Sequence, residues 1–170
     1  MMNRALKLAA ALSMALAMTA CAKNAADDAS LAGGGLGGRG GAGAGYATPG
    51  SAQDFATNVG DRVFFESDST ELSSTAQATL EKQARWLNQY GRYSFTVEGH
   101  ADERGTREYN FALGARRAEV TKEYLVARGV SASRIKTISY GKERPVAVCN
   151  DISCWSQNRR AVTVLAGGQS

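Results

Sequence analysis

Four side chains that could take part in acid–base or metal chemistry lie close together near the middle of the chain: Glu98, His100, Asp102 and Glu103. A histidine beside carboxylates can act as a general base or as a metal ligand. His100 is the only histidine in the sequence, whereas a zinc site needs three or four ligands. Glu98, His100 and Asp102 would also face one way only if a strand continued through Gly99 and beyond. We therefore expect no metal site here and a protein that is not an enzyme.

Arg117 occupies an unusual place for a charged residue. It belongs to a row of residues spaced by four, three and four along one side of a predicted helix: Leu113, Arg117, Val120 and Tyr124. Arg116 is turned by about 100° from that row. A guanidinium on the core side needs an anion, because a buried charge without a partner is too costly to keep.

Two kinds of anion fit this requirement. One interpretation is an internal salt bridge from Arg117 to Asp102 or Asp68. The other is that Arg117 and Asp102 line a cleft and hold a zwitterion between them. A planar guanidinium takes a carboxylate with two parallel hydrogen bonds, which a lysine could not do, and an aspartate takes an ammonium group.

The elements that must position these residues lie between Gly60 and Leu165, in one globular domain. Apolar periodicity predicts strands at 63–65, 93–97, 135–140 and 161–165, and helices at 74–90 and 110–128. Ser74 and Gln77 predict a capping box at the start of the first helix. The order is that of an α+β domain, a β-α-β-α-β-β sandwich with helices packed on one face of a small mixed sheet.

Several motifs in this domain carry a family resemblance. They are Glu98-Gly99-His100-Ala101-Asp102-Glu103-Arg104-Gly105-Thr106, Tyr109-Asn110, Leu113, Arg116-Arg117-Ala118, Ser139-Tyr140-Gly141 and Asn158-Arg159-Arg160. Together they resemble the OmpA-like peptidoglycan-binding domain, over essentially the whole globular part. The resemblance implies non-covalent binding of peptidoglycan through diaminopimelate, whose side chain ends in a free carboxylate and a free ammonium on one carbon.

The motif Gly-His-Ala-Asp-Glu-Arg-Gly-Thr resembles the Tol-associated lipoproteins of this family more closely than its porin members. This implies TolB and the Tol complex as partners, with a role in envelope integrity and in constriction during cell division. An OmpA-like lipoprotein anchor without Tol partners is the alternative within the fold. A cell-wall hydrolase is the alternative from another class.

The same resemblance assigns roles to single residues. It gives the ligand ammonium to Asp102 and the ligand carboxylate to Arg117. Asp68 matches a loop, residues 65–68, whose backbone amides help to hold that carboxylate, although Ser67 stands where a phenylalanine is common. Alternatively, Asp68 is a cap on the approach to the first helix.

Three further residues match positions near the pocket. Asn110 and Leu113 correspond to its floor, and Arg159 to the first arginine of an Asn-Arg-Arg signature beside the cleft. The two polar residues of the three, Asn110 and Arg159, also have simpler interpretations. Asn110 would serve as the N-cap of the second helix, and Arg159 as an exposed surface charge.

The N-terminus has the pattern of an export signal. Arg4 and Lys7 precede an uncharged apolar run, residues 8–20, which is shorter than the roughly 20 residues that a membrane-spanning helix needs. The sequence Met-Thr-Ala-Cys that ends at Cys21 resembles the bacterial lipobox, which implies a diacylglycerol and an N-acyl chain on Cys21. An ordinary signal peptide with an incidental cysteine is the alternative. Ala22, in place of an aspartate, implies sorting to the outer membrane, with the protein on its periplasmic face.

Composition divides the chain into three parts: a signal peptide (1–20), a lipidated N-terminus with a glycine-rich tether (21–58), and the OmpA-like domain (59–170). The tether has too few large apolar groups to fold, and it lacks the flanking strand and Gly-Lys-Ser/Thr of a phosphate loop. The formal charge is +4, but basic residues alternate with acidic ones, so we expect no nucleic-acid binding.

Cys149 and Cys154 are the two cysteines left once Cys21 is acylated. An even pair in an oxidising compartment favours a disulfide, worth about 2 kcal/mol for so small a loop. Two cysteines alone cannot hold a metal ion. We expect the bond to stiffen the loop before Trp155 rather than to form part of the site.

Overall fold

The computed structural model describes residues 47–166. Cys21, the leader and most of the glycine-rich segment lie outside the described residues, so the lipid attachment site stays a prediction. Between residues 47 and 166, no helix combines the length and the apolar character needed to cross a membrane.

Four strands form one mixed sheet in the order β1-β4-β2-β3. Their bounds are Arg62–Phe64 (β1), Phe95–His100 (β2), Ile135–Gly141 (β3) and Arg160–Leu165 (β4). β4 runs antiparallel to both β1 and β2, whereas β2 and β3 are parallel. On β2, Phe95 and Val97 are buried and alternate with partly exposed residues, as expected for a strand with one covered face.

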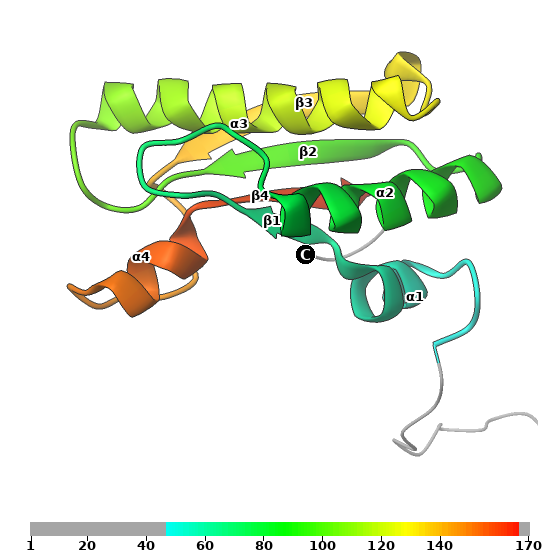
Figure 1. Ribbon diagram of the computed structural model, residues 1–170, viewed down its shortest axis with the longest axis horizontal. Coiled ribbons are helices and arrows are strands. Elements are labelled where there is room, and N and C mark those ends of the chain that lie inside the picture. Colours follow the sequence, from blue (N-terminus) through cyan, green and yellow to red (C-terminus); the bar gives the residue numbers. More distant parts are fainter. Residues whose placement is uncertain (1–46, 167–170) are drawn as a thin grey trace, which may run out of the picture. The chain divides into compact units, whose positions relative to one another are not determined.

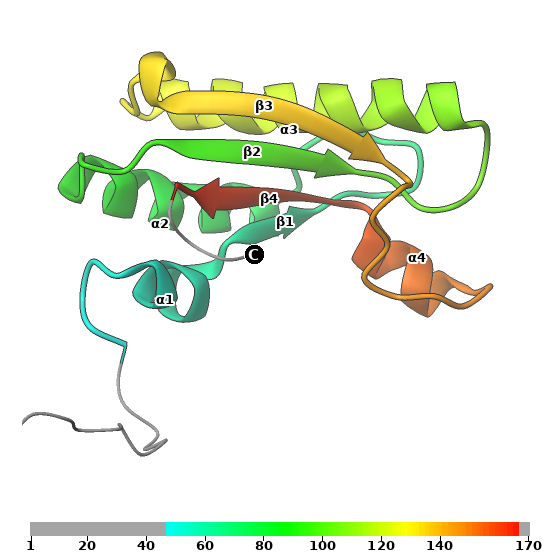
Figure 2. The same ribbon diagram turned by 180° about the vertical axis from the view of Figure 1, so that it is seen from behind.

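Two long helices, α2 (Ser74–Gln89) and α3 (Arg107–Ala127), cover one face of this sheet (Figure 1). Seen from behind, the sheet lies in front of both helices (Figure 2). Side chains from the helices and the covered face form a single core that includes Leu80, Leu87, Val97 and Leu125. The predicted α+β architecture is therefore confirmed.

α3 lies directly against the backbone of β2. A Cβ placed on Gly99 would stand 1.8 Å from the carbonyl oxygen of Gly114, and one on Gly114 would stand 2.4 Å from Ser139 Oγ. Only glycine at both positions permits this approach. Arg117 lies about one helical turn beyond Gly114, so the contact brings its side chain to the end of β2.

α2 begins at Ser74, its predicted first residue, whereas α3 begins at Arg107, three residues before the predicted start, and the cap of each helix differs from the predicted one. Ser73 is the N-cap of α2 and accepts a hydrogen bond from the amide of Ala76 at 3.2 Å, so the capping box predicted at Ser74 is displaced by one residue. Thr106 is the N-cap of α3 and accepts from the amide of Tyr109 at 3.2 Å. The interpretation of Asn110 as a helix cap is therefore wrong.

Four short helical elements were not predicted. They are α1 (Ala52–Asp54), the π-helical turn η1 (Phe55–Gly60), the 3-10 turn η2 (Ala132–Arg134) and α4 (Ile152–Asn158). Phe55 is buried against Trp86, with ring centroids 4.9 Å apart, and Trp86 Nε1 donates to Asp54 at 2.8 Å. The packed part of the chain thus begins before residue 59, the boundary that composition predicts.

Candidate functional site

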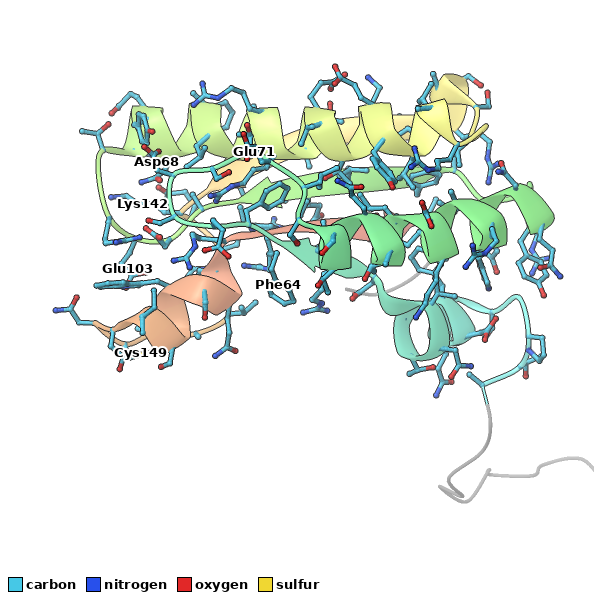
Figure 3. All side chains as sticks on the ribbon, viewed as in Figure 1. Phe64, Asp68, Glu71, Glu103, Lys142 and Cys149 are labelled. Carbon is cyan, nitrogen blue, oxygen red and sulfur yellow. A yellow bond between two sulfur atoms is a disulfide. The ribbon has the colours of Figure 1, made fainter. Side chains whose placement is uncertain are left out.

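The predicted site residues gather where the loops after β1 and β2 meet the start of α3. In Figure 3, Asp68, Glu103 and Cys149 are labelled at this end of the sheet. A pocket of about 230 Å³ opens between the loops, lined by Ser67, Asp68, Asp102, Arg104, Gly105, Tyr109, Asn110, Leu113 and Arg117. Five of the six predicted binding residues line it, and Arg159 lies behind it. A larger hollow of about 620 Å³ lies beside β3, where the lining charges Arg107 and Glu143 are exposed and pair with each other at 3.2 Å.

Arg117 is fully buried, and its guanidinium binds three backbone carbonyls. Nε donates to Ser69 O at 2.9 Å, Nη1 to His100 O at 2.9 Å and Nη2 to Glu66 O at 3.1 Å. The interpretation of Arg117 as one half of an internal salt bridge is therefore wrong. Since a guanidinium has five N–H donors, one hydrogen on each terminal nitrogen lies beyond these three bonds.

Arg117 carries its charge at the floor of the pocket. Burial, and next the charge of Arg159, lower its pKa to about 10, while Asp102, Asp68 and Tyr109 act in the opposite direction. At neutral pH the side chain is still protonated. The three carbonyl dipoles stabilise it in place of a carboxylate.

Asp102 supplies the opposite charge, and both of its oxygens accept hydrogen bonds. Arg104 donates from Nη2 to Oδ2 at 2.6 Å and from Nε to Oδ1 at 3.1 Å, and Arg159 Nη1 donates to Oδ2 at 3.3 Å. Burial by itself raises the pKa of Asp102, but the hydrogen bonds and charge of Arg104, with the bond from Arg159, hold it below its usual value. The carboxyl is therefore ionised at neutral pH.

Arg159 is 4% exposed, so the interpretation of it as a surface charge is wrong. Its Nε donates to Phe65 O at 3.0 Å, in addition to the bond to Asp102. Arg159 thus fixes Asp102 from behind and ties it to the loop after β1.

The remaining predicted residues shape the walls. Asp68 adopts a left-handed backbone conformation (φ 56°) and accepts a hydrogen bond from the hydroxyl of Tyr109. It does not cap α2, since Ser73 does. Asn110 Nδ2 donates to Arg104 O at 2.7 Å and to Thr106 O at 3.1 Å, which holds the loop between β2 and α3. Leu113, 4% exposed, adds an apolar wall.

The predicted disulfide is confirmed: Cys149 and Cys154 are bonded, with their Cα atoms 5.7 Å apart. The residue that follows the closed loop reaches the site, which the sequence did not indicate. Trp155, the next residue on α4, donates from Nε1 to Glu103 Oε1 at 2.5 Å, and its ring lies 4.3 Å from the guanidinium of Arg104. Arg104 belongs to the family motif, but no pattern in the sequence placed Trp155 against it.

His100 does not join this site. It ends β2 and stacks on Tyr140, on the sheet face opposite the helices, with its nearest carboxylate, Glu98 Oε2, 3.7 Å from Nε2. Neither ring nitrogen has a hydrogen-bond partner among the described residues. Within residues 47–166, no three His, Cys, Asp or Glu side chains are grouped so as to hold a metal ion.

Because His100 is buried, we expect the free energy of unfolding of the domain to depend on pH. Burial, and then the charges of Arg160, Arg144 and Arg62, lower its pKa from 6.5 to about 3. The unfolded chain therefore takes up a proton below about pH 6.5 that the folded domain takes up only near pH 3, so stability falls as the pH is lowered through this window. We expect the free energy of unfolding to drop by about 2 kcal/mol between pH 7 and pH 5, measured by urea unfolding.

His100→Gln is the matched control, because the chain contains no other histidine. The variant is expected to lose little stability between pH 7 and pH 5. Parallel slopes for the two proteins over this range would contradict the assignment.

Comparisons with known proteins identify the family of this chain. The sequence model of the OmpA family matches residues 64–159. A peptidoglycan-associated lipoprotein from Rhizobium meliloti (strain 1021) is 65% identical over 162 residues, covering 94% of this chain and 88% of the relative. One from Brucella melitensis biotype 1 is 59% identical over 162 residues, covering 94% and 92%.

A solved structure is also similar. The crystal structure of the peptidoglycan-associated lipoprotein from Burkholderia pseudomallei aligns with a TM-score of 0.61 at 40% identity, over 62% of this chain and 90% of that chain. The family match includes all the residues that line the pocket. The chain belongs to the OmpA family, among its peptidoglycan-associated lipoproteins.

Proposed function

We propose that this protein is a non-enzymatic outer-membrane lipoprotein that binds peptidoglycan non-covalently and so links the membrane to the cell wall. Its relatives are named peptidoglycan-associated lipoproteins, which supports both halves of this function. Cys21 would carry the diacylglycerol and the N-acyl chain, and the glycine-rich segment after it would span the distance to the wall.

The pocket supports the choice of ligand. It holds a carboxylate that is ionised, Asp102, and a guanidinium that is protonated, Arg117, in a space of about 230 Å³. Opposite charges that line one small pocket favour a zwitterion over an ion of one sign. The end of the diaminopimelate side chain is such a group: Arg117 would bind its carboxylate through the two remaining N–H groups, and Asp102 its ammonium.

Sacculus sedimentation tests this assignment. Asp102→Asn keeps the shape of the side chain and removes its charge. Arg117→Lys keeps the charge and removes the planar guanidinium with its parallel N–H donors. Each variant is expected to bind sacculi about 30-fold or more weakly, since truncating one partner of a buried, hydrogen-bonded charge pair costs about 2–5 kcal/mol.

The matched controls are Asp61→Asn and Arg62→Lys, which alter an ion pair of 2.8 Å outside the pocket. They are expected to sediment like the wild type. We call the joint binding of the zwitterion by Asp102 and Arg117 the clamp. Wild-type sedimentation of both pocket variants would contradict it. Soluble muropeptides released from sacculi over time would contradict a purely binding function and favour a hydrolase.

The finer role follows from the family resemblance. From the sequence of residues 99–106, we propose TolB and the Tol complex as partners, and a role in envelope integrity and in constriction during cell division. Pull-down of TolB from solubilised envelopes separates this role from that of an anchor without Tol partners.

A further inference from the structure

Arg104 occupies the place where the ammonium of a ligand would bind. It donates to both oxygens of Asp102, from Nη2 at 2.6 Å and from Nε at 3.1 Å. Its backbone amide donates to Oδ1 as well, at 3.2 Å. Behind the carboxylate stands Arg159. An ammonium group can therefore reach Asp102 only where the side chain of Arg104 now lies.

Two further contacts hold Arg104 in this position. Nη2 donates to Ser67 Oγ at 2.8 Å, which connects the loop after β1, and the guanidinium lies 4.3 Å from the ring of Trp155. Arg104 thus bridges the two loops that form the mouth of the pocket.

Arg104 differs from the other two arginines of the site in its exposure. Its side chain is 43% exposed, whereas that of Arg159 is 5% exposed and Arg117 is fully buried. Arg117 and Arg159 also hold backbone carbonyls that would lose their donors if those side chains moved. Arg104 donates to no buried carbonyl, so it can leave Asp102 without unpacking the core.

Trp155 provides a surface for the displaced guanidinium. Its indole is fixed by the hydrogen bond to Glu103 and by α4, whose first turn is joined to Cys149 by the disulfide. A cation over an aromatic face keeps its attraction while its hydrogens face water or a ligand. Asp102 keeps Arg159 and the amide of Arg104 when the side chain departs, so the carboxylate stays ionised and in position.

We propose that Arg104 is a displaceable plug: its guanidinium occupies Asp102 in the free protein, a ligand ammonium must displace it, and Trp155 holds it beside the site. This inference rests on the proposed binding of a diaminopimelate zwitterion in the same pocket. The plug lowers the apparent affinity by the fraction of molecules in which Asp102 is free. A ligand with an adjoining carboxylate offsets this cost, because Arg117 binds that group, while a simple amine has no such compensation.

Calorimetric titration of the full-length protein in detergent tests the plug. The probe is the tripeptide L-alanyl-γ-D-glutamyl-meso-diaminopimelate. Arg104→Ala is expected to bind it about two- to fivefold more tightly than the wild type, the range that a partly exposed ion pair supports. Arg107→Ala removes a neighbouring arginine outside the pocket and is expected to bind like the wild type. Equal or weaker binding by Arg104→Ala would overturn the plug and make Arg104 a support for Asp102.

A second variant tests the role of Trp155. Trp155→Leu is expected to weaken binding by a small factor when Arg104 is present, because the displaced guanidinium loses the ring that holds it, and to have no effect when Arg104 is already alanine. The same change in both backgrounds would mean that Trp155 contacts the ligand, which would overturn its role as a seat for Arg104.

Asp102→Asn separates this inference from the function on which it rests. Unchanged tripeptide binding by Asp102→Asn would refute the clamp and the plug together. Weakened binding by Asp102→Asn, combined with no gain from Arg104→Ala, would keep the clamp and overturn the plug alone.

Discussion

Replacing Arg117 by methionine is expected to lower the free energy of unfolding by about 3–5 kcal/mol. Methionine keeps much of the apolar stem but leaves the carbonyls of Ser69 and His100 without this donor, while Glu66 O keeps only the amide of Ser69, at 3.2 Å. A buried acceptor left without a partner costs about 1–3 kcal/mol, and water can enter to satisfy part of the set. Urea unfolding at pH 7 measures the difference.

Arg116→Met is the matched control, because Arg116 is the neighbouring residue on α3 and is exposed. Its effect is expected to stay within about 0.5 kcal/mol. If Arg117→Met were as stable as this control, the carbonyl bonds would contribute nothing, and Arg117 would serve the ligand alone.

The same contacts give Arg117 two roles. By tying the loop after β1 to the end of β2, it builds the pocket whose charge it supplies. A lysine could make only part of this set of bonds, so Arg117→Lys alters both the shape and the charge of the site. Asp102→Asn is therefore the cleaner test of ligand recognition, since Arg159 and Arg104 can still donate to the amide oxygen.

The sequence predicted which residues meet but not how they bind one another. Helical spacing correctly placed Arg117 on the buried side of α3. The salt bridge to Asp102 or Asp68 was wrong because the partners of Arg117 are backbone carbonyls. Every residue carries a carbonyl, so no pattern of residue types reveals which ones a fold turns toward a side chain.

The elements that were missed share a physical cause. α1 and α4 have three and seven residues, too few for an apolar stripe to show helical periodicity. Trp155 meets Arg104 across 51 positions of sequence, and the path between them runs through α3 and β3. Only the packed loops bring them together, whereas the long helices and strands show their buried faces in the sequence itself.

Gly99→Ala is expected to destabilise the domain by at least about 4 kcal/mol or to prevent folding. The new Cβ would lie 1.8 Å from Gly114 O and 3.2 Å from the Cβ of Ala118, so α3 would have to move away from β2. A clash with backbone cannot be relieved by a change of rotamer, which separates this case from ordinary overpacking. Urea unfolding, with circular dichroism to detect failure to fold, measures the loss.

Gly91→Ala is the control, because a Cβ there meets nothing within 4 Å, and its effect is expected to be within about 0.5 kcal/mol. Equal stability of the two variants would show that α3 does not rest on the backbone of β2. If Gly99→Ala folds at low temperature, sacculus binding is expected to fall as well. The shift that admits the methyl group also moves Arg117, one turn beyond Gly114, away from the carbonyl of His100, so the close contact of two glycines sets the geometry of the pocket at the end of the strand.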